Sequence, residues 1–197
     1  MTTRTDTPKK RCGWCGDDPL YMNYHDHEWG VPVTDDGILF EFLILEGAQA
    51  GLAWITVLRK RDGYRLLFDN LNAAKIARYT DKKLDKILLD PRIIRNRLKV
   101  YGARKNARAF LAVQEEFGSF FNYLAAFIDH KPIQNDWESH AQVPATTAIS
   151  DVISKDMKQR GFTFVGSTII YAYMQATGMT NDHATDCFRH HECKKLA

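Results

Sequence analysis

The longest apolar stretch of the chain covers residues 40–58, FEFLILEGAQAGLAWITVL. Its apolar residues occupy all sides of a helix rather than one face, which predicts a buried helix or a helix that is broken once. Glu46 places a charge in its middle, and Gly47 and Gly51 leave one face beside it without side chains. A backbone or a flat ligand is expected to approach there, next to the indole of Trp54.

The carboxylate of Glu46 has two interpretations. A charged group among apolar side chains loses its hydration, so it needs a cationic partner, a proton or a chemical role. It is therefore either part of a pocket wall, together with the open face and Trp54, or an ordinary core residue that pairs with an arginine or a helix N-terminus. The apolar stretch alone leaves both interpretations open, since perturbed groups only raise the odds of a functional site.

The rest of the pattern also predicts helices, each with recognisable start and stop signals. Thr34 or Asp35 is expected to cap the helix that carries Glu46. No alternating strands are evident, so the predicted fold class is all-α. The further predicted elements are a short helix after Asn72, one from Thr80 or Asp81 to Leu88, helices over 98–117 and 120–128, a loop over 129–145, a helix from Thr146 or Thr147 to Arg160, a last buried helix from Phe164 to Thr177, and a polar tail over 180–197.

Length and composition fit one domain or two closely packed lobes, because the chain has 197 residues and 45% of them are apolar. The net charge of +3 allows an anionic partner without demanding one. We expect no membrane span, since every apolar run of the length needed is interrupted by polar residues. Residues 1–10 are polar and are predicted to be disordered. The N-terminal segment has no apolar core typical of a secretory signal, so a cytoplasmic location is predicted.

The four cysteines cluster at the two ends of the chain, which suggests thiols and metal binding rather than disulfides. His183 and Cys187 are spaced to lie one helical turn apart, a reach that suits tetrahedral zinc. Spacing leaves their partners open between Cys12 with Cys15 and Cys12 with His25. A site joining both ends would be structural; the alternative is free cysteines and exposed histidines. The full set of candidates is Cys12, Cys15, His25, His27, His183, His190, His191, Cys187 and Cys193.

A second cluster is aromatic. Tyr21, Tyr24 and Glu28 fall on one helical face, and Trp29 follows directly. Two tyrosines and nearby tryptophans can enclose a flat ring. The alternative is a set of amphipathic aromatic residues that pack on the surface of the domain.

A third cluster is basic. Residues 86–108 contain eight lysines and arginines but a single acid, Asp90. A hairpin of two helices here would aim backbone N–H groups and cations at phosphates. A solvated basic helix is the alternative, but the local concentration of charge in a nearly neutral chain favours nucleic-acid binding.

Six motifs of the chain are specific when taken together: RCGW at 11–14, DPLYMNYHDHEWGVP at 18–32, LEGAQAGLAWITVL at 45–58, IIRNRLK at 93–99, GFTFVGSTIIYAYMQATG at 161–178 and NDH at 181–183. With these motifs the chain resembles the bacterial DNA-3-methyladenine glycosylase I family. The resemblance spans roughly residues 11–187. It implies an all-α member of the helix-hairpin-helix DNA glycosylase superfamily, with one catalytic domain over 11–187, a hairpin at about 84–99 and a C-terminal tail over 188–197.

The resemblance also implies an activity, which is hydrolysis of the N-glycosidic bond of 3-methyladenine in double-stranded DNA. The products are the free base and an abasic site. Glu46 is the implied catalytic residue, in a base pocket with Tyr21, Tyr24, Trp29 and Trp54. Leu52 is implied to fill the gap left by the extruded nucleotide. The remaining implied residues are the DNA contacts Arg92, Arg95 and Lys99 and the ligands of one structural Zn²⁺, Cys12, His25, His183 and Cys187.

Two residues depart from the family pattern. Cys15 forms a CxxC pair with Cys12 and so competes with His25 for metal. Arg92 stands where many such hairpins carry glycine. Its side chain either restricts the turn and weakens the close approach to DNA or adds a phosphate contact of its own.

No second carboxylate is evident as a general base, so we expect electrostatics and the DNA's own phosphates to aid the attack of water.

Two other functions are compatible with parts of the pattern. One is a non-catalytic zinc-stabilised DNA-binding module, and the other is a metal-dependent hydrolase built on the terminal histidines and cysteines. Neither accounts as simply for a buried acid among aromatic side chains. We expect a monomer without membrane contact.

Overall fold

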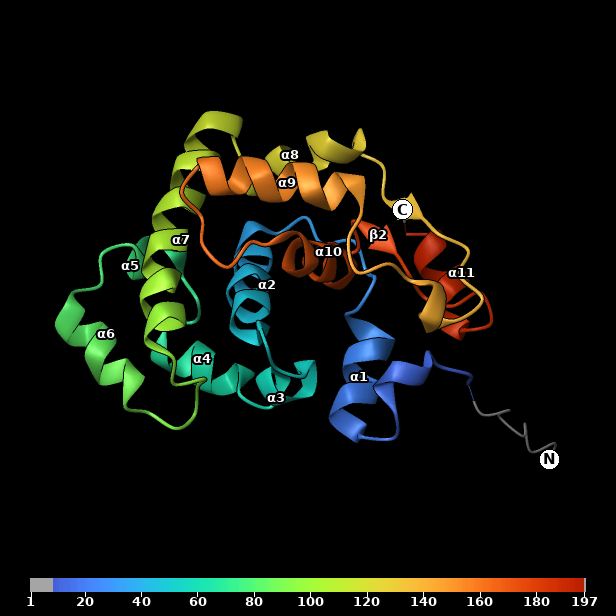
Figure 1. Ribbon diagram of the computed structural model, residues 1–197, viewed down its shortest axis with the longest axis horizontal. Helices are drawn as coiled ribbons and strands as arrows, with labels where there is room; N and C mark the ends of the chain where they lie inside the picture. The colour runs from blue at the N-terminus through green and yellow to red at the C-terminus, as the bar shows by residue number, and fades with distance from the viewer. Residues whose placement is uncertain (1–8, 197) are drawn as a thin grey trace, which may run out of the picture.

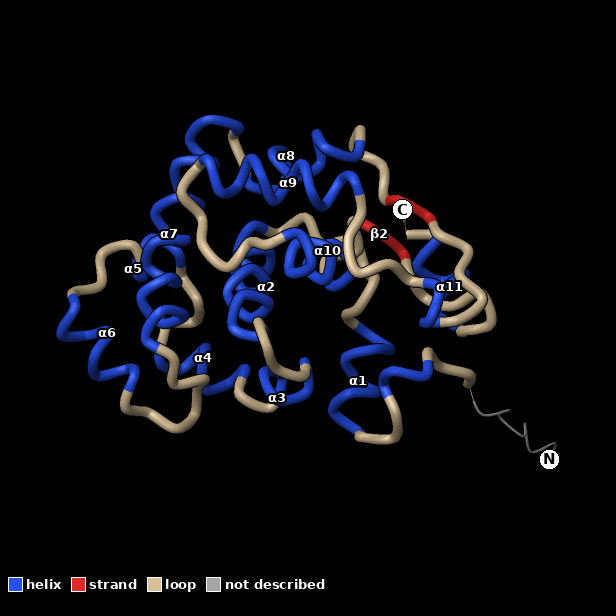
Figure 2. Tube along the Cα trace, viewed as in Figure 1, coloured by secondary structure: helices blue, strands red, loops and turns tan. Residues whose placement is uncertain are grey.

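A computed structural model of the chain describes residues 9–196 and is mostly helical (Figures 1 and 2). Residues 1–8, which hold most of the segment predicted to be disordered, lie outside the described residues. In chain order the helices are α1 Pro19–His27, α2 Asp36–Gln49, α3 Trp54–Leu58, α4 Arg61–Leu67, α5 Ala73–Ile76, α6 Asp81–Leu88, α7 Arg97–Phe117, α8 Phe120–Ala125, α9 Ala148–Gln159, α10 Ser167–Ala176 and α11 Phe188–Lys194. Three short 3₁₀ helices are η1 Gly13–Cys15, η2 Ala126–Ile128 and η3 His140–Gln142.

Polar caps explain why several helices begin where they do. The side chain of Asp35 accepts a hydrogen bond from the backbone N–H of Ile38 and starts α2. Asn72, Thr80 and Thr147 cap α5, α6 and α9 in the same way. These starts confirm the sequence-based prediction. The helix predicted from Phe164 begins later, at Ser167.

Helix α2 lies at the centre of the fold and packs against α3, α7, α8 and α10 (Figure 1). Every residue from 39 to 48 is buried, which is why the helix is apolar on all sides. The chain breaks after Gln49 through Gly51, whose φ of +78° is left-handed, and resumes as α3. Of the two possibilities that the sequence left open, an unbroken helix and a helix broken once, the second is correct. The open face expected at Gly47 instead receives the side chain of Phe164, which lies 3.2 Å from the position of an added Cβ.

The turn after α10 holds the segment after α1 against that helix. Gly178 has a φ of +68°, and a Cβ there would lie 2.3 Å from the carbonyl carbon of Val31. Gly30 donates its backbone N–H to the carbonyl of Gln175 at 3.0 Å, and Val33 donates to that of Thr177 at 3.0 Å. The α1 segment and α10 are therefore fixed relative to each other, and both contribute to the site described below.

A small parallel sheet corrects the prediction of a strand-free fold. Strand β1, Ile133–Gln134, pairs with β2, Thr180–Asn181. Each strand has two residues, which is too short for an alternating pattern to be visible in the sequence. The two strands also lie far apart in the sequence, so their pairing depends on tertiary contacts.

The C-terminal segment is more ordered than the predicted polar tail. Helix α11 packs on β2, and its residues His190 and Cys193 are buried. Asn181 donates its side-chain amide to the carbonyl of His190 at 3.0 Å, which ties the helix to the strand. Figure 1 shows α1 and α11 on the same side of α2, with α5, α6 and α7 on the opposite side. Within residues 9–196, none of the helices combines the length and the apolar character needed to cross a membrane.

Candidate functional site

A cavity of about 220 Å³ opens between α1, α2, α3 and α10. It is smaller than the pockets that bind drug-sized ligands and so suits a small flat molecule. All five residues predicted to form the base pocket line this one cavity. Its walls are formed by Trp14, Tyr21, Tyr24, Trp29, Glu46, Gln49, Trp54, His140, Ala172 and Gln175.

The carboxyl group of Glu46 is buried in this wall, with 4% of the residue exposed. Burial raises its pKa to about 8. Its Oε2 atom has no hydrogen-bond partner within residues 9–196. The core interpretation, in which an arginine or a helix N-terminus pairs with Glu46, is therefore wrong, and the carboxyl group is available to a ligand.

Two indole N–H groups on the same wall are also unsatisfied. The Nε1 atoms of Trp14 and Trp54 are buried without an acceptor in the described part of the chain. Their rings belong to an aromatic cluster in which Trp14 lies 4.9 Å from Tyr21 and Trp54 lies 5.4 Å from Tyr24, between ring centroids. Buried polar atoms are nearly always paired in folded proteins. The residues of this cavity therefore carry one unpaired acceptor, on Glu46, and two unpaired donors, on Trp14 and Trp54. A binding site for a flat polar ligand needs such groups.

Leu52 lies in the turn between α2 and α3, which both contribute to the cavity. The side chain is partly exposed, and its backbone N–H donates to the carbonyl of Gln49 at 2.6 Å. An exposed leucine in the turn between two helices that line the cavity is compatible with the predicted insertion into DNA.

The predicted hairpin consists of α6, α7 and the turn over residues 89–96. Arg92 folds back within this turn, because both its backbone N–H and its guanidinium donate to Asp90 at 2.6 to 2.9 Å. A Cβ at Gly63 would lie 2.3 Å from the carbonyl oxygen of Arg92, so α4 packs directly on the turn. Arg95 is exposed in the same turn. The turn thus forms without the glycine that many such hairpins carry.

Lys99 is placed differently from the expectation of a DNA contact. Its Nζ atom donates to the carbonyl oxygens of Ala48 and Ala50, both at 2.7 Å. Burial lowers the pKa of this ammonium group. The ammonium group caps α2, because the last carbonyls of a helix have no partner within the helix. Lys99 therefore holds the turn that carries Leu52.

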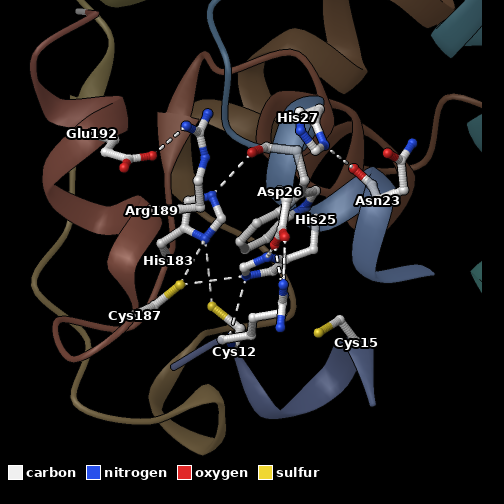
Figure 3. A network of polar contacts seen from close by, with 12 residues as sticks. Cys12, Cys15, Asn23, His25, Asp26, His27, His183, Cys187, Arg189 and Glu192 are labelled. Carbon is white, nitrogen blue, oxygen red and sulfur yellow. Dashed lines mark hydrogen bonds and ion pairs between the residues drawn. The ribbon is translucent and has the colours of Figure 1, made fainter. Parts of the chain in front are cut away.

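The two ends of the chain meet in a buried cluster of Cys12, His25, His183 and Cys187 (Figure 3). Their nearest ligand atoms all lie within 4.8 Å of one another. Cys12 Sγ is 3.5 Å from His183 Nδ1, and Cys187 Sγ is 3.4 Å from His25 Nε2. A tetrahedral zinc ion with normal bond lengths would separate sulfur and nitrogen ligands by about 3.6 Å. The geometry of the cluster fits such an ion.

Outer contacts orient both imidazoles toward the cluster. The Nδ1 atom of His25 is 2.8 Å from a carboxylate oxygen of Asp26, and the Nε2 atom of His183 is 3.0 Å from the carbonyl oxygen of Trp29. Metal-binding histidines typically have such partners on the nitrogen that does not bind the metal. Trp29 also lines the cavity, so the cluster and the cavity share a residue.

The other candidate ligands lie outside the cluster. Cys15, which competed with His25, is directed toward the carbonyl of Gly16 at 3.7 Å and is separate from the four ligands in Figure 3. His27 contacts the carbonyl of Asn23, and His190 contacts that of Asn135.

Five residues of the cavity wall were not predicted: Trp14, Gln49, His140, Ala172 and Gln175. Trp14 and Gln175 lie inside the recognised motifs at 11–14 and 161–178, so position within a motif was a usable signal. Gln49 is an amide within the apolar stretch, three residues after Glu46, so the sequence also contained a usable signal for it. His140 belongs to a segment predicted as a loop and gave no signal, since only the tertiary fold brings η3 to the cavity.

Comparison with known sequences gives consistent matches over almost the whole chain. A sequence model described as methyladenine glycosylase matches residues 14–190. The chain is 44% identical over 178 residues to DNA-3-methyladenine glycosylase 1 of Escherichia coli (strain K12), covering 90% of this chain and 95% of that protein. It is 44% identical over 177 residues to DNA-3-methyladenine glycosylase of Haemophilus influenzae, covering 90% and 96%.

Solved structures of 3-methyladenine DNA glycosylases also match the chain. A crystal structure of 3-methyladenine DNA glycosylase I matches with a TM-score of 0.89 and 46% sequence identity, covering 91% of this chain and 98% of that one. A single-residue variant of a 3-methyladenine DNA glycosylase I, in complex with 3-methyladenine, matches with a TM-score of 0.88 and 32% identity, covering 90% and 96%.

Proposed function

The chain belongs to the methyladenine glycosylase family and is a DNA base-excision repair glycosylase, and we propose that the cavity around Glu46 is where it binds 3-methyladenine. A similar protein has been crystallised with 3-methyladenine bound. The observation that carries the proposal is the unpaired carboxyl group of Glu46 among aromatic side chains.

The chemistry of the substrate explains why this wall suits it. Methylation at N3 makes the adenine ring cationic in DNA, which already weakens the bond between C1′ and N9. Glu46 as a carboxylate accepts hydrogen bonds from the adenine edge and stabilises the positive ring. The faces of Trp54 and the tyrosines attract a cation and stack on a flat base. The pocket therefore binds the charged, damaged base better than its neutral parent.

A base inside a DNA duplex cannot reach a buried cavity, so the nucleotide has to leave the stack. A methylated base costs less to unstack and unpair than an intact one, which adds to selection. Leu52 fills the space that the extruded nucleotide leaves. The proposal is supported by the position of Leu52 in the turn between α2 and α3, because both helices contribute to the cavity.

The reaction itself is a hydrolysis. The C1′–N9 bond breaks with its electron pair moving to the base, a water oxygen bonds to C1′, and the water's proton is released. Glu46 is the only acid among the residues of the cavity wall, and we assign it to the base rather than to the water. The DNA's phosphates and the charge distribution of the pocket stabilise the positive sugar while water attacks.

We propose that α6, α7 and their turn form a helix-hairpin-helix motif that binds the phosphate backbone. Arg95 is exposed there and Arg92 is next to it, so both can contact phosphates. Lys99 supports this surface indirectly through its contacts with the end of α2.

We further propose one Zn²⁺ bound by Cys12, His25, His183 and Cys187. All four ligand positions are supplied by protein, so the ion fastens the two ends of the chain and leaves no site open for chemistry. The resulting protein is expected to act as a monomer in the cytoplasm.

Incubation with methylated double-stranded DNA tests the activity. We expect free 3-methyladenine to appear in the supernatant, identified by chromatography, with abasic sites left in the DNA. A non-catalytic DNA-binding module would leave the alkylated DNA intact. A metal-dependent hydrolase would lose turnover on chelation while still folded.

A further inference from the structure

Gln175 of α10 lines the cavity with an orientation that the rest of the protein fixes. It follows Ala172 by one helical turn, and both residues contribute to the cavity wall. The Nε2 atom of Gln175 donates to the Oδ2 atom of Asp182 at 2.7 Å. Its backbone carbonyl accepts from Gly30 at 3.0 Å, which holds it against the segment that carries Trp29.

Asp182 is buried, and the donors that reach it from residues 9–196 are all neutral. Tyr171 donates to the same oxygen as Gln175, at 2.5 Å, and Trp137 donates to the other oxygen at 2.9 Å. Asn135 and Thr180 also donate to this second oxygen, at 2.7 and 3.3 Å. Both oxygens of the carboxylate are therefore acting as acceptors.

A carboxylate that accepts can bind the amide of Gln175 only through its NH₂ group. The hydrogen-bond chemistry therefore fixes which end of the amide faces Asp182, and the Oε1 atom lies on the other side. Within residues 9–196 no hydrogen bond reaches this Oε1 atom, and it is not among the buried unsatisfied atoms. Gln175 thus offers the cavity an acceptor that cannot be exchanged for a donor.

Gln49 shows the contrast on the same wall. It also lines the cavity, but its side chain makes no hydrogen bond with the described residues. Its amide is therefore free to turn and to present either its oxygen or its NH₂ group. Of the two glutamines, only Gln175 can discriminate between a donor and an acceptor on a ligand.

We propose that Gln175 is a specificity-determining residue, whose Oε1 atom accepts a hydrogen bond from the exocyclic amino group of the base. Asp182 is the positioning residue that fixes the amide. An amino group carries two hydrogens, so it can donate to Glu46 and to Gln175 together. This inference rests on the proposed function, because it assumes that the cavity receives the excised base.

The consequence is discrimination at position 6 of the purine ring. 3-Methyladenine has an amino group there, whereas 3-methylguanine carries the same methyl group and has a carbonyl oxygen at position 6. That oxygen would face the Oε1 atom of Gln175 without a hydrogen between them, leaving both acceptors unpaired. Sites built to hydrogen-bond one group reject an analogue that lacks it, because their own polar atoms are then left unpaired.

The experiment uses one sample of methylated duplex DNA that contains both lesions and measures the two free bases released by each protein. Wild type is expected to release 3-methyladenine in preference to 3-methylguanine. Gln175→Met keeps the length of the side chain but removes its acceptor, and it is expected to lower the release ratio by ~10-fold. Tyr171→Phe is the matched control, since it removes a donor to the same Asp182 oxygen but leaves the amide of Gln175 bound. Its release ratio is expected to equal that of wild type.

Quenching of tryptophan fluorescence by each free base gives a second measurement that does not depend on turnover. The same loss of preference is expected in Gln175→Met and, if that variant does not fold, in Gln175→Leu. An unchanged preference in a folded Gln175 variant, an equal loss in Tyr171→Phe, or a wild type without preference would overturn the inference. Failure of wild type to release any 3-methyladenine would instead contradict the proposed function itself.

Discussion

Glu41 and Glu46 are both buried on α2, yet within the described part of the chain only Glu41 is paired. Glu41 accepts hydrogen bonds from Arg61 at 2.5 Å and from Arg65 at 2.8 Å. Burial opposes ionisation of Glu41, but the two arginines outweigh it and hold its pKa below the ordinary value. Glu46 has burial without a cation, and its pKa rises to about 8. The same helix therefore carries one structural carboxylate and one that is available for binding.

Glu46→Gln is expected to stabilise the protein more as pH rises. The unfolded chain ionises Glu46 near pH 4.5, whereas the folded protein keeps it protonated up to about pH 8. The stability associated with the proton is fully present below pH 4.5 and is lost between pH 4.5 and 8. At pH 7 this loss is about 3 kcal/mol at most, and glutamine avoids it. Urea unfolding of both proteins at several pH values measures the difference.

Glu41→Gln is the control for that series. The pKa of Glu41 is lowered in the folded state, so its contribution is present above its unfolded pKa and is lost on acidification. This variant should be less stable than wild type at pH 7, and the two proteins should converge in acid. If the difference in free energy of unfolding between wild type and Glu46→Gln did not change with pH, the carboxyl group of Glu46 would have to be exposed or paired.

The rate of excision is expected to depend on the ionisation of Glu46. At low substrate concentration, kcat/KM for 3-methyladenine should rise with pH through a midpoint near 8, because only the carboxylate attracts the cationic base. In Glu46→Gln the rate should be far lower and lack this transition. Single-turnover assays between pH 6 and 9 measure both profiles. Equal rates and the same midpoint in the two proteins would remove Glu46 from the mechanism.

Trp54→Ala should affect excision far more than DNA binding. The indole lines the cavity, where it would contribute stacking and cation–π attraction to the extruded base, whereas the proposed phosphate contacts are on α6, α7 and their turn. Excision rates and binding of undamaged duplex can be compared in the same buffer. A parallel loss of both quantities would place Trp54 in the DNA surface or in the stability of the fold instead.

Elemental analysis tests the terminal cluster. Protein purified without added metal should contain about one zinc per chain, because the four donors have the spacing of a tetrahedral site. Cys187→Ser should lose most of the zinc and show a lower Tm, since the ion joins segments with little core of their own. Cys15→Ser is the matched control and should keep its zinc. Folded wild-type protein without zinc would reject the site.

Lys99 and Arg95 should separate stability from DNA binding. Lys99→Met removes the cap on α2 and should lower the free energy of unfolding by about 1 kcal/mol. Arg95→Met should change stability by less than about 0.5 kcal/mol. It should weaken binding to all duplex sequences alike and reduce the salt dependence by about one unit. Unaltered salt dependence in Arg95→Met would exclude a phosphate contact.

Features that depend on local sequence were predictable. The buried helix around Glu46 and the caps at Asp35, Asn72 and Thr147 follow from neighbouring residues, whereas the sequence left the break after Gln49 as one of two possibilities. Features that depend on distant contacts were not. The role of Lys99 requires knowing that α7 starts beside the end of α2, and the orientation of Gln175 requires the buried Asp182. The two-residue strands and α11 likewise form only against elements from elsewhere in the chain.

The cluster that joins the ends of the chain has a consequence for biosynthesis. Cys12 and His183 are separated by 171 positions, and His25 and Cys187 by 162. A ribosome releases the first two ligands long before it makes the last two. The aromatic wall contributed by Trp14, Tyr21 and Trp29 is therefore expected to become fixed only after Cys187 has been made. A nascent chain that stalls before Cys187 is therefore expected to form its helical centre without completing the proposed base-binding cavity.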